Sequence, residues 1–452
     1  MNCTVPQIRA RCFYMSGQVT DTRQSWGAAF KAYLQPVMLI MLALGFASGL
    51  PYMMVFQKMS FWLREVGIER STIGFFYWVT FAYSFKFLWA PVVDNLKLPF
   101  LTKWLGHRRS WMLLAMVGTV IGMAVIGSSD PAANLTHTVI GALILSFAGA
   151  TLDISIDAWR IESAPNEEQA QMAAVYTLGY RFAIMASGLA LAMAGWFNWS
   201  VAFITLAGLM SLNVIILLLF VQEPVRVTRR RMQNAKDVIT EYIVNPFLSI
   251  ITRMGKWAFV VLLLVAFYRI SDFTMGVMAY PLYSDLGFSK QSVGLISSGY
   301  GVWITIFGAM IGGLFVVRFG LMRSLLLGAV LTMITTAAYA WLSVQPDPLV
   351  RNLFVTIAAD NIAGGFAATV FIAYLSSLVD KRYTATQYAF LSSLYSFFLK
   401  FASGFSGVFV DKIGYEKFFY LTAAYCIPVI ALILFLMAFG SDASKGIQKQ
   451  ES

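Results

Sequence analysis

Eight charged side chains lie inside or at the edges of long apolar segments of this 452-residue chain. A charge at the centre of a bilayer costs about 2.5–3.5 kcal/mol on insertion scales, so each one marks a candidate functional position. Four are cations and four are carboxylates: Lys86, Asp153, Asp157, Arg181, Arg269, Asp272, Asp360 and Lys400. Because they fall on different segments, they predict a polar cavity that runs through a bundle of helices.

The apolar segments themselves predict a protein that crosses the membrane many times. The chain is 59% hydrophobic and 12% charged, and its mean hydropathy is +0.70. A spanning helix needs about 20 apolar residues. Such runs fall at approximately 36–61, 72–93, 110–128, 136–159, 170–194, 199–221, 257–283, 291–317, 321–343, 350–379, 384–410 and 415–438. We therefore expect an all-α membrane protein with twelve helices.

A polar stretch divides these runs into six and six, which sets the expected domain organisation. We expect an N-terminal six-helix bundle over residues 36–221 and a C-terminal six-helix bundle over residues 257–438. The linker 222–256, the N-terminal segment 1–35 and the tail 439–452 are expected in the cytoplasm. The linker is basic, and a solvated loop without a separate role is its simpler interpretation.

The basic residues predict the orientation in the membrane. Of the 33 Lys and Arg residues, 22 fall in segments on the side of the N-terminus. Seven are expected in loops on the opposite side: Lys58, Arg64, Arg70, Lys290, Arg351, Lys412 and Lys417. Because basic residues are retained in the cytoplasm, both termini are expected there. The same distribution explains the formal net charge of +11 without a nucleic-acid partner.

The N-terminal residues and the cysteines show no pattern typical of a signal peptide, a disulfide framework or a metal site. The first thirty-odd residues are polar and lack the apolar core of a signal peptide, so we expect no cleaved signal, and Met15 is an alternative start. The three cysteines, Cys3, Cys12 and Cys426, show neither a disulfide framework nor a metal-ligand spacing. No metal or cofactor is therefore expected.

One short sequence suggests an enzyme and has to be weighed. Residues 404–407, Gly-Phe-Ser-Gly, match the Gly-x-Ser-Gly of rhomboid proteases. A serine nucleophile needs a base within reach, and the two histidines, His107 and His137, are expected in loops on opposite sides of the membrane. An intramembrane enzyme or lipid-modifying protein is therefore the disfavoured alternative. No nucleotide-binding pattern appears, so transport energy is expected to come from an ion gradient.

Two loops at equivalent positions of the two halves carry degenerate copies of one signature. The loop after the second run reads Ala-Pro-Val-Val-Asp over 90–94 and, after an insertion, Gly-His-Arg-Arg over 106–109. The loop after the eighth run reads Gly-Leu-Phe-Val-Val-Arg-Phe-Gly-Leu-Met-Arg over 313–323. Both resemble the Gly-x-x-x-Asp-Arg-x-Gly-Arg-Arg signature of the major facilitator superfamily. The resemblance implies two six-helix halves related by pseudo-two-fold symmetry.

The signature also has a physical reading as a latch. A carboxylate at a helix end that pairs with basic residues and a helix terminus can stabilise one of two rigid-body states. The gating candidates are Asp94, Arg108, Arg109, Arg318 and Arg323. We expect the first three to form a cytoplasmic latch that favours the outward-open state. Simple anchoring of the topology by these arginines remains the alternative.

Further short sequence segments, in order along the chain, indicate which family within the superfamily the chain resembles. They are Leu44-Gly-Phe-Ala-Ser-Gly-Leu-Pro51, Thr72-Ile-Gly-Phe-Phe76, Phe85-Lys-Phe-Leu-Trp-Ala-Pro91, Asp153-Ile-Ser-Ile-Asp157-Ala-Trp159, Leu178-Gly-Tyr-Arg181, Asp360-Asn-Ile-Ala-Gly-Gly365 and Ala385-Thr-Gln-Tyr-Ala389. This set resembles the AmpG muropeptide permease family of Gram-negative bacteria, whose relatives include acetyl-CoA transporters and some siderophore permeases. The resemblance implies proton-coupled import of anhydromuropeptides across the inner membrane. A permease for another anionic solute, such as a siderophore or acetyl-CoA, is the alternative.

The four intramembrane cations suit an anionic substrate. Lys86, Arg181, Arg269 and Lys400 are expected at middle depth on helices that face the cavity in this fold. Arg181 and Lys400 lie on equivalent helices, so we expect them to hold one ligand from both sides. Arginine binds a carboxylate through two parallel hydrogen bonds, and muropeptides carry peptide carboxylates. The alternative is that the cations form structural ion pairs only.

The sugar part of such a substrate needs aromatic faces and polar partners. We select Tyr180, Tyr395 and Asn361 as further substrate-binding candidates. The wider aromatic set also contains Trp78, Tyr83, Tyr176, Tyr268 and Tyr300. For each of these the alternative is packing or a place in the interfacial belt.

The carboxylates are candidates for proton coupling. Asp153 and Asp157 are four residues apart and share one helix face. Two carboxylates at close range hinder each other's ionisation, which suits a group that must take up and release a proton. We rank Asp157 and Asp360 first and Asp153 third, with Asp272 also a candidate. Structural ion pairs with neighbouring cations are the alternative for each.

Overall fold

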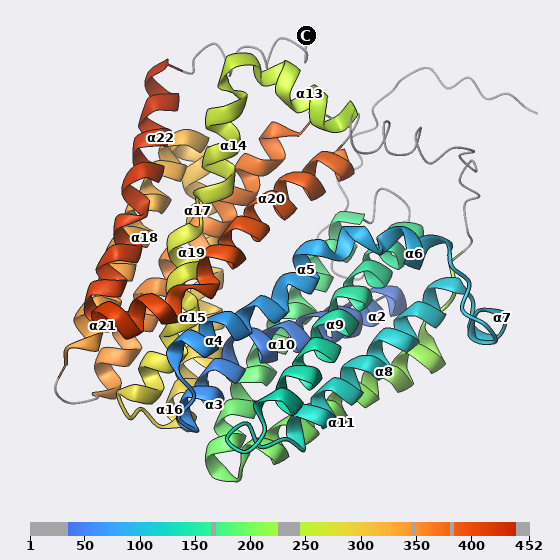
Figure 1. Ribbon diagram of the computed structural model, residues 1–452. Helices are drawn as coiled ribbons and strands as arrows, with labels where there is room; N and C mark the ends of the chain where they lie inside the picture. The colour runs from blue at the N-terminus through green and yellow to red at the C-terminus, as the bar shows by residue number, and fades with distance from the viewer. Residues whose placement is uncertain (1–34, 164–168, 225–244, 346–348, 380–383, 440–452) are drawn as a thin grey trace, which may run out of the picture.

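Two bundles of helices lie side by side in the computed structural model of the protein (Figure 1). The structure describes residues 35–163, 169–224, 245–345, 349–379 and 384–439. The predicted N-terminal segment and C-terminal tail lie almost wholly outside these ranges, as does the middle of the predicted linker. Helices and their connections make up the described part, and no strand occurs in it.

The first bundle begins at the predicted position and runs to the predicted linker. Its elements are α2 (Pro36–Met53), the π-helical segment Met54–Lys58, α3 (Met59–Glu65), α4 (Arg70–Phe76), the 3-10 segment Tyr77–Thr80, α5 (Phe81–Phe85), the 3-10 segment Lys86–Leu88, α6 (Ala90–Asn95), α7 (Leu101–Leu105), α8 (His107–Gly127), α9 (Leu135–Ser163), α10 (Gln169–Trp196) and α11 (Trp199–Phe220).

The second bundle is preceded by a helix, α13, that lies within the predicted linker. The elements are α13 (Asn245–Met254), the 3-10 segment Gly255–Trp257, α14 (Ala258–Phe267), α15 (Ile270–Asp285), α16 (Lys290–Gly294), the π-helical segment Leu295–Tyr300, α17 (Gly301–Phe319), α18 (Leu321–Ser343), α19 (Val350–Leu378), α20 (Thr384–Gly404), α21 (Ser406–Ala424) and α22 (Cys426–Phe439). Helix α21 is broken at Gly414, whose φ is 78°, between the last two predicted spans.

The described part contains 10 helices long and apolar enough to cross a membrane. The predicted span 72–93 is missing from this number because it folds as several short pieces, and 384–410 because it is more polar. Both stretches are helical from end to end apart from single-residue breaks. The all-helical membrane architecture is thus confirmed, and the count of twelve spans stays a prediction for these two.

Breaks in the helices put two of the predicted cations at irregular backbone. Lys86 opens the 3-10 segment between α5 and α6. Arg269 precedes the first residue of α15, with a φ of −101° and a ψ of 14°, where the chain leaves α14. Irregular backbone at membrane depth is tolerated where it lines a cavity or is buried in protein. The breaks therefore coincide with the positions where the sequence predicted a polar interior.

The two bundles pack together at one end and diverge toward the other (Figure 1). The largest hydrophobic cluster joins both halves and includes Trp62 and Phe203 of the first and Tyr283 and Phe419 of the second. We call this region, where α3 and α4 meet α15 and α16, the joined end. The opposite end, which carries α6, α7 and α13, is called the split end.

Lys58 does not lie where the sequence predicts it. The charge distribution predicts a loop on the side opposite the termini, but Lys58 ends a π-helical segment within the first span and is 0% exposed. Its Nζ donates to Tyr280 Oη at 2.6 Å and Ser298 Oγ at 2.9 Å, both in the other half. An ammonium with hydroxyl partners can be buried at an interface that a hydropathy pattern does not show.

Candidate substrate site

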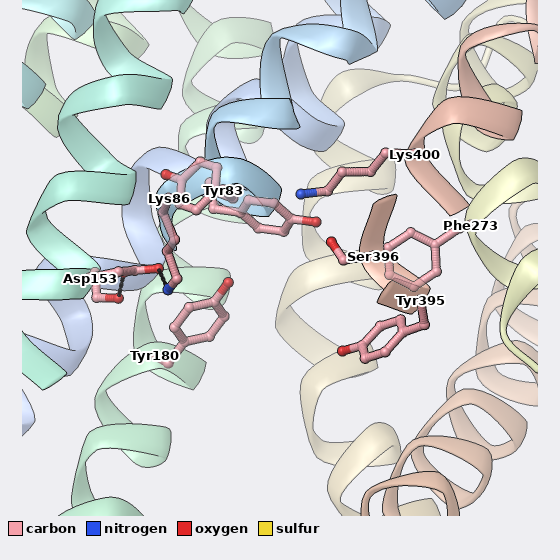
Figure 2. Close-up of a pocket in the computed structure, with 10 residues that line it drawn as sticks. Tyr83, Lys86, Asp153, Tyr180, Phe273, Tyr395, Ser396 and Lys400 are labelled. Carbon is pink, nitrogen blue, oxygen red and sulfur yellow. Dashed lines mark hydrogen bonds and ion pairs between the residues drawn. The ribbon is translucent and has the colours of Figure 1, made fainter. Parts of the chain in front are cut away.

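A cavity of about 200 Å³ lies between the two halves, next to the broken second span. Six of its lining residues come from the first half and four from the second: Ser48, Tyr52, Tyr83, Lys86, Asp153 and Tyr180, then Phe273, Tyr395, Ser396 and Lys400. Figure 2 shows Lys86 and Lys400 reaching in from opposite sides. Sites for drug-sized ligands measure about 300–1,000 Å³, so this cavity suits one charged group or one sugar of a larger ligand.

An ion pair forms the wall of the cavity on the side of the first half. Lys86 Nζ lies 3.3 Å from Asp153 Oδ2 (Figure 2). Asp153 also accepts a hydrogen bond from Ser48, which contacts Tyr176 Oη at 2.6 Å. Three helices, α2, α9 and α10, thus surround one carboxylate whose partner cation sits on the broken second span.

Lys400 forms the opposite wall of the cavity. Its side chain is buried, with 3% of the residue exposed, and Nζ donates to the backbone oxygen of Thr80 at 3.0 Å. The rings of Tyr52 and Tyr83 lie 5.8 Å and 5.7 Å from Nζ, within cation–π range. Within the described ranges no ion pair to Lys400 occurs. A buried ammonium of this kind favours an anionic ligand.

The predicted cations therefore separate into two groups. Lys86 and Lys400 line the cavity, together with the predicted aromatic residues Tyr180 and Tyr395. Arg181 is not among the lining residues, so the cavity brings Lys86, rather than Arg181, opposite Lys400.

The second group lies elsewhere in the bundle. Arg269 forms an ion pair with Asp272 three residues later, in the first turn of α15. Asn361 accepts a hydrogen bond from Thr305 at 2.7 Å and donates to the backbone of its own helix. Neither Arg269 nor Asn361 lines the cavity. Their roles in substrate binding stay predictions.

The predicted proton carriers occupy different surroundings. Asp153 is in the cavity, whereas Asp157 lies 3.5 Å from Arg160 and its side chain is 45% exposed. Asp360 accepts a hydrogen bond from Tyr339 at 3.4 Å in the second half. Among the four predicted proton carriers, Asp153 lines the cavity and Asp157, Asp272 and Asp360 do not.

Comparisons with known proteins give the family. The family model described as Major Facilitator Superfamily matches residues 37–349 and 260–451. The chain is 32% identical over 407 residues to the anhydromuropeptide permease of Escherichia coli (strain K12), covering 89% of this chain and 80% of that protein. This chain belongs to the AmpG family of the major facilitator superfamily. The resemblance seen in its helix blocks is thereby confirmed.

Two further matches agree with that assignment. "Putative transporter AmpG 4" of Rickettsia felis is 31% identical over 402 residues, covering 87% of this chain and 94% of that protein. The solved structure of a D-xylose–proton symporter superposes with a TM-score of 0.67 at 15% identity, covering 89% and 97% of the two chains. The latter similarity shows the fold alone. A transporter, rather than an enzyme, is the class to which these relatives belong.

The Gly-Phe-Ser-Gly sequence lies where α20 ends and α21 begins in this AmpG-family chain. Ser406 is fully buried and its Oγ donates to the backbone oxygen of Thr274 at 2.9 Å. Of the two histidines, His107 donates from Nε2 to Val93 O at 2.8 Å in the first half. Neither of these contacts builds a nucleophile with its base.

The superfamily loop signature forms a network inside the first half. The buried Arg108 lies 2.6 Å from Asp94 and 2.7 Å from Glu162. Arg109 contacts neither carboxylate and donates at 2.9 Å to the oxygen of Leu218 in the last turn of α11. These contacts tie α6, α8, α9 and α11 together. A latch between open states stays a prediction for these residues.

The second copy of the signature is more exposed. Arg318 and Arg323 lie on either side of Gly320, where α17 ends and α18 begins, and both side chains are exposed. The backbone turns there with a φ of 82°. No ion pair involves either arginine within the described part of the chain. Their gating role stays a prediction.

The contacts of Arg108 give a prediction about stability. Arg108→Ala should leave two carboxylates without their shared cation, and because Asp94 is partly exposed the cost should lie below the value of about 3–5 kcal/mol for a fully buried pair. We expect a clear drop in the melting temperature of the detergent-solubilised protein. Lys97→Ala, an exposed cation near α6, is the matched control and should have little effect. Equal melting temperatures for the two variants would contradict a bracing role for Arg108.

The sequence does not predict a site role for four of the lining residues: Ser48, Tyr52, Phe273 and Ser396. Ser396 lies four residues before Lys400, so the i, i+4 rule for one helix face could have found it. In the same way Tyr52 follows Ser48 by four residues. Phe273 carries no charge or polar atom, and nothing in its local sequence distinguishes it from a packing residue.

Proposed function

We propose that this protein imports anhydromuropeptides across the bacterial inner membrane as a proton-coupled secondary transporter that exposes its cavity to each side in turn. The observation that carries the proposal is Lys400, a buried cation without a carboxylate partner in the described part of the chain, facing Lys86 across a cavity. The peptide carboxylates of a muropeptide would complete this charge arrangement. The relative named anhydromuropeptide permease supports the same substrate class.

The ion pair of Lys86 and Asp153 supports the coupling to protons. While Asp153 is charged, it holds Lys86 at 3.3 Å. When Asp153 takes up a proton, Lys86 loses its partner and can bind a substrate carboxylate instead. Proton and anionic substrate would therefore enter together, which is the requirement for symport.

The positive-inside rule supports the direction of the molecule in the membrane. The split end carries α6, α7 and α13, next to the basic loops that the sequence analysis assigned to the cytoplasm (Figure 1). In this orientation both termini are cytoplasmic and the joined end faces the periplasm. The structure would then represent a form closed toward the periplasm.

The substrate class is tested by counterflow into proteoliposomes. Vesicles loaded with unlabelled anhydromuropeptide should take up labelled anhydromuropeptide when wild-type protein is present. Excess external anhydromuropeptide should suppress the signal, whereas a ferric siderophore or acetyl-CoA should leave it unchanged. Competition by either of these two anions, with no effect of the muropeptide, would favour a permease for another anionic solute.

A further inference from the structure

The two halves carry the same charged turn at the joined end. In the first half Glu65, Gly67, Arg70 and Gly74 follow each other at spacings that the second half repeats exactly 220 residues later. The repeated residues are Asp285, Gly287, Lys290 and Gly294. Both first glycines have positive φ values, 85° and 76°. The pseudo-two-fold symmetry therefore extends to the individual charges.

These charges pair across the halves in a crossed manner. Arg70 of the first half lies 2.7 Å from Asp285 of the second. Lys290 of the second half lies 2.7 Å from Glu65 of the first. Glu65 and Asp285 occupy equivalent positions in the two turns. Each basic residue thus binds the acidic residue of the other turn and not the one in its own turn. The same ion pair is made twice, once on each side of the pseudo-two-fold axis.

The first of the two pairs is reinforced by neighbours. Asp285 is also 2.5 Å from Arg64 and accepts a hydrogen bond from Tyr415 Oη at 2.8 Å. Arg70 in turn contacts Asp411 at 3.3 Å. The contacts of Arg64 and Arg70 join the two halves, and the hydrogen bond from Tyr415 to Asp285 lies within the second half.

Glycine contacts below the charges are repeated in the same way. A Cβ on Gly74 would overlap the backbone oxygen of Gly404 in the other half. A Cβ on Gly294 would overlap the backbone oxygen of Gly188, again in the other half. The two acceptor glycines both follow Ala-Ser, at 186–188 and 402–404. The helices can approach this closely only because no side chain intervenes.

Contacts between the two halves continue from the joined end to the cavity. Beyond the charged pairs come the glycine contacts and the buried Lys58, which binds Tyr280 and Ser298 of the opposite half. Next, Lys400 donates to Thr80 O, and Ser84 Oγ contacts Ser396 Oγ at 2.9 Å. Lys400 and Ser396 already line the cavity.

We infer that the two crossed ion pairs, Arg70–Asp285 and Lys290–Glu65, form a duplicated lock that holds the cavity closed at the joined end. Because the side chains are partly exposed, each pair contributes little alone, in the range of a surface ion pair. Two equivalent pairs act in parallel on one rigid-body movement, so their effects should add. The glycine contacts set the distance at which both pairs can form.

Spin-label distances across the joined end test the lock. Labels are attached at Ala133→Cys and Val344→Cys, exposed residues in loops of the two halves away from the ion pairs, after Cys3, Cys12 and Cys426 have been replaced. Pulsed electron paramagnetic resonance then gives the fraction of molecules with a long distance. Glu65→Gln and Asp285→Asn should each raise this fraction about threefold, and the double variant about tenfold.

Two matched variants make the result decisive. Glu69→Gln removes an exposed carboxylate of the same turn, for which the described part of the chain shows no ion pair, and should leave the distances unchanged. Lys290→Gln breaks the same pair as Glu65→Gln and should reproduce its shift. Unchanged distances in the double variant would overturn the lock, as would an equal shift with Glu69→Gln or none with Lys290→Gln.

This inference rests on the proposed alternating exposure of the cavity, but its test needs no substrate. If the distances shift and no muropeptide is transported, the lock stands and the proposed substrate fails. If transport is found and the distances do not shift, only the lock is refuted.

Discussion

Lys400→Met is expected to weaken anhydromuropeptide binding by at least about 30-fold, which corresponds to ~2 kcal/mol. The reason is that Lys400 is a buried cation beside a hydroxyl- and aromatic-lined cavity, with a backbone oxygen as its hydrogen-bond partner. Methionine keeps most of the apolar stem and removes the charge. Equilibrium binding of labelled anhydromuropeptide to purified protein measures the effect.

The control for this variant lies on the next helix, α21. Lys412→Met removes an exposed cation beyond Ser406, outside the cavity of Lys400, and should bind substrate as the wild type does. The elution volume and melting temperature of both variants show whether they are folded. Wild-type affinity in a folded Lys400→Met protein would remove Lys400 from the substrate site.

Asp153→Asn is expected to abolish accumulation of substrate while leaving exchange intact. An asparagine can still accept the hydrogen bond from Ser48, but it cannot carry a proton across the membrane. A pH difference of one unit supplies about 1.4 kcal/mol per proton, enough for about tenfold accumulation. The variant should therefore fall to an accumulation ratio of about 1.

The other two ranked carboxylates provide the comparison for Asp153. Asp157→Asn and Asp360→Asn alter groups outside the cavity, paired with Arg160 and hydrogen-bonded by Tyr339 respectively. The sequence ranks both above Asp153, whereas we propose Asp153 first because it lines the cavity. Accumulation at the wild-type level in Asp153→Asn, with loss of accumulation in either of the others, would restore the original order.

The membrane class and most of the helices could be predicted from the sequence because they depend on local hydropathy. Long apolar runs with few charges can only be satisfied as helices in a bilayer. The loop signature and the helix blocks then gave the family. The limits of the second span were also close, since α4 begins at Arg70 and α6 ends at Asn95.

The internal breaks could not be predicted, because they result from contacts between distant helices. The second span contains two 3-10 segments within an apolar run whose composition is that of a continuous helix. Lys400 binds the oxygen of Thr80 at one of these breaks, 320 positions earlier in the chain. Nothing in either local sequence shows that the two meet.

The sequence predicts several of the residues that line the cavity, but not which of them lie opposite each other. Lys86, Lys400, Tyr180 and Tyr395 were selected because charge and aromatic rings are conspicuous in an apolar run, and all four line it. The opposing partner of Lys400 was expected to be Arg181, since helix equivalence was the only guide. Which cation faces the cavity depends on how deep it lies in the bundle and on how its helix is rotated about its own axis. Both depend on packing between helices.

Uptake into proteoliposomes under an imposed pH gradient tests the central proposal most directly. Wild-type protein is reconstituted, and the internal concentration of labelled anhydromuropeptide is compared with the external one, with and without a gradient that is acidic outside. We expect an accumulation ratio near 10 for a gradient of one pH unit with one proton per substrate, and a ratio of 1 without the gradient. Equal internal and external concentrations under both conditions, in vesicles that hold their gradient, would contradict it.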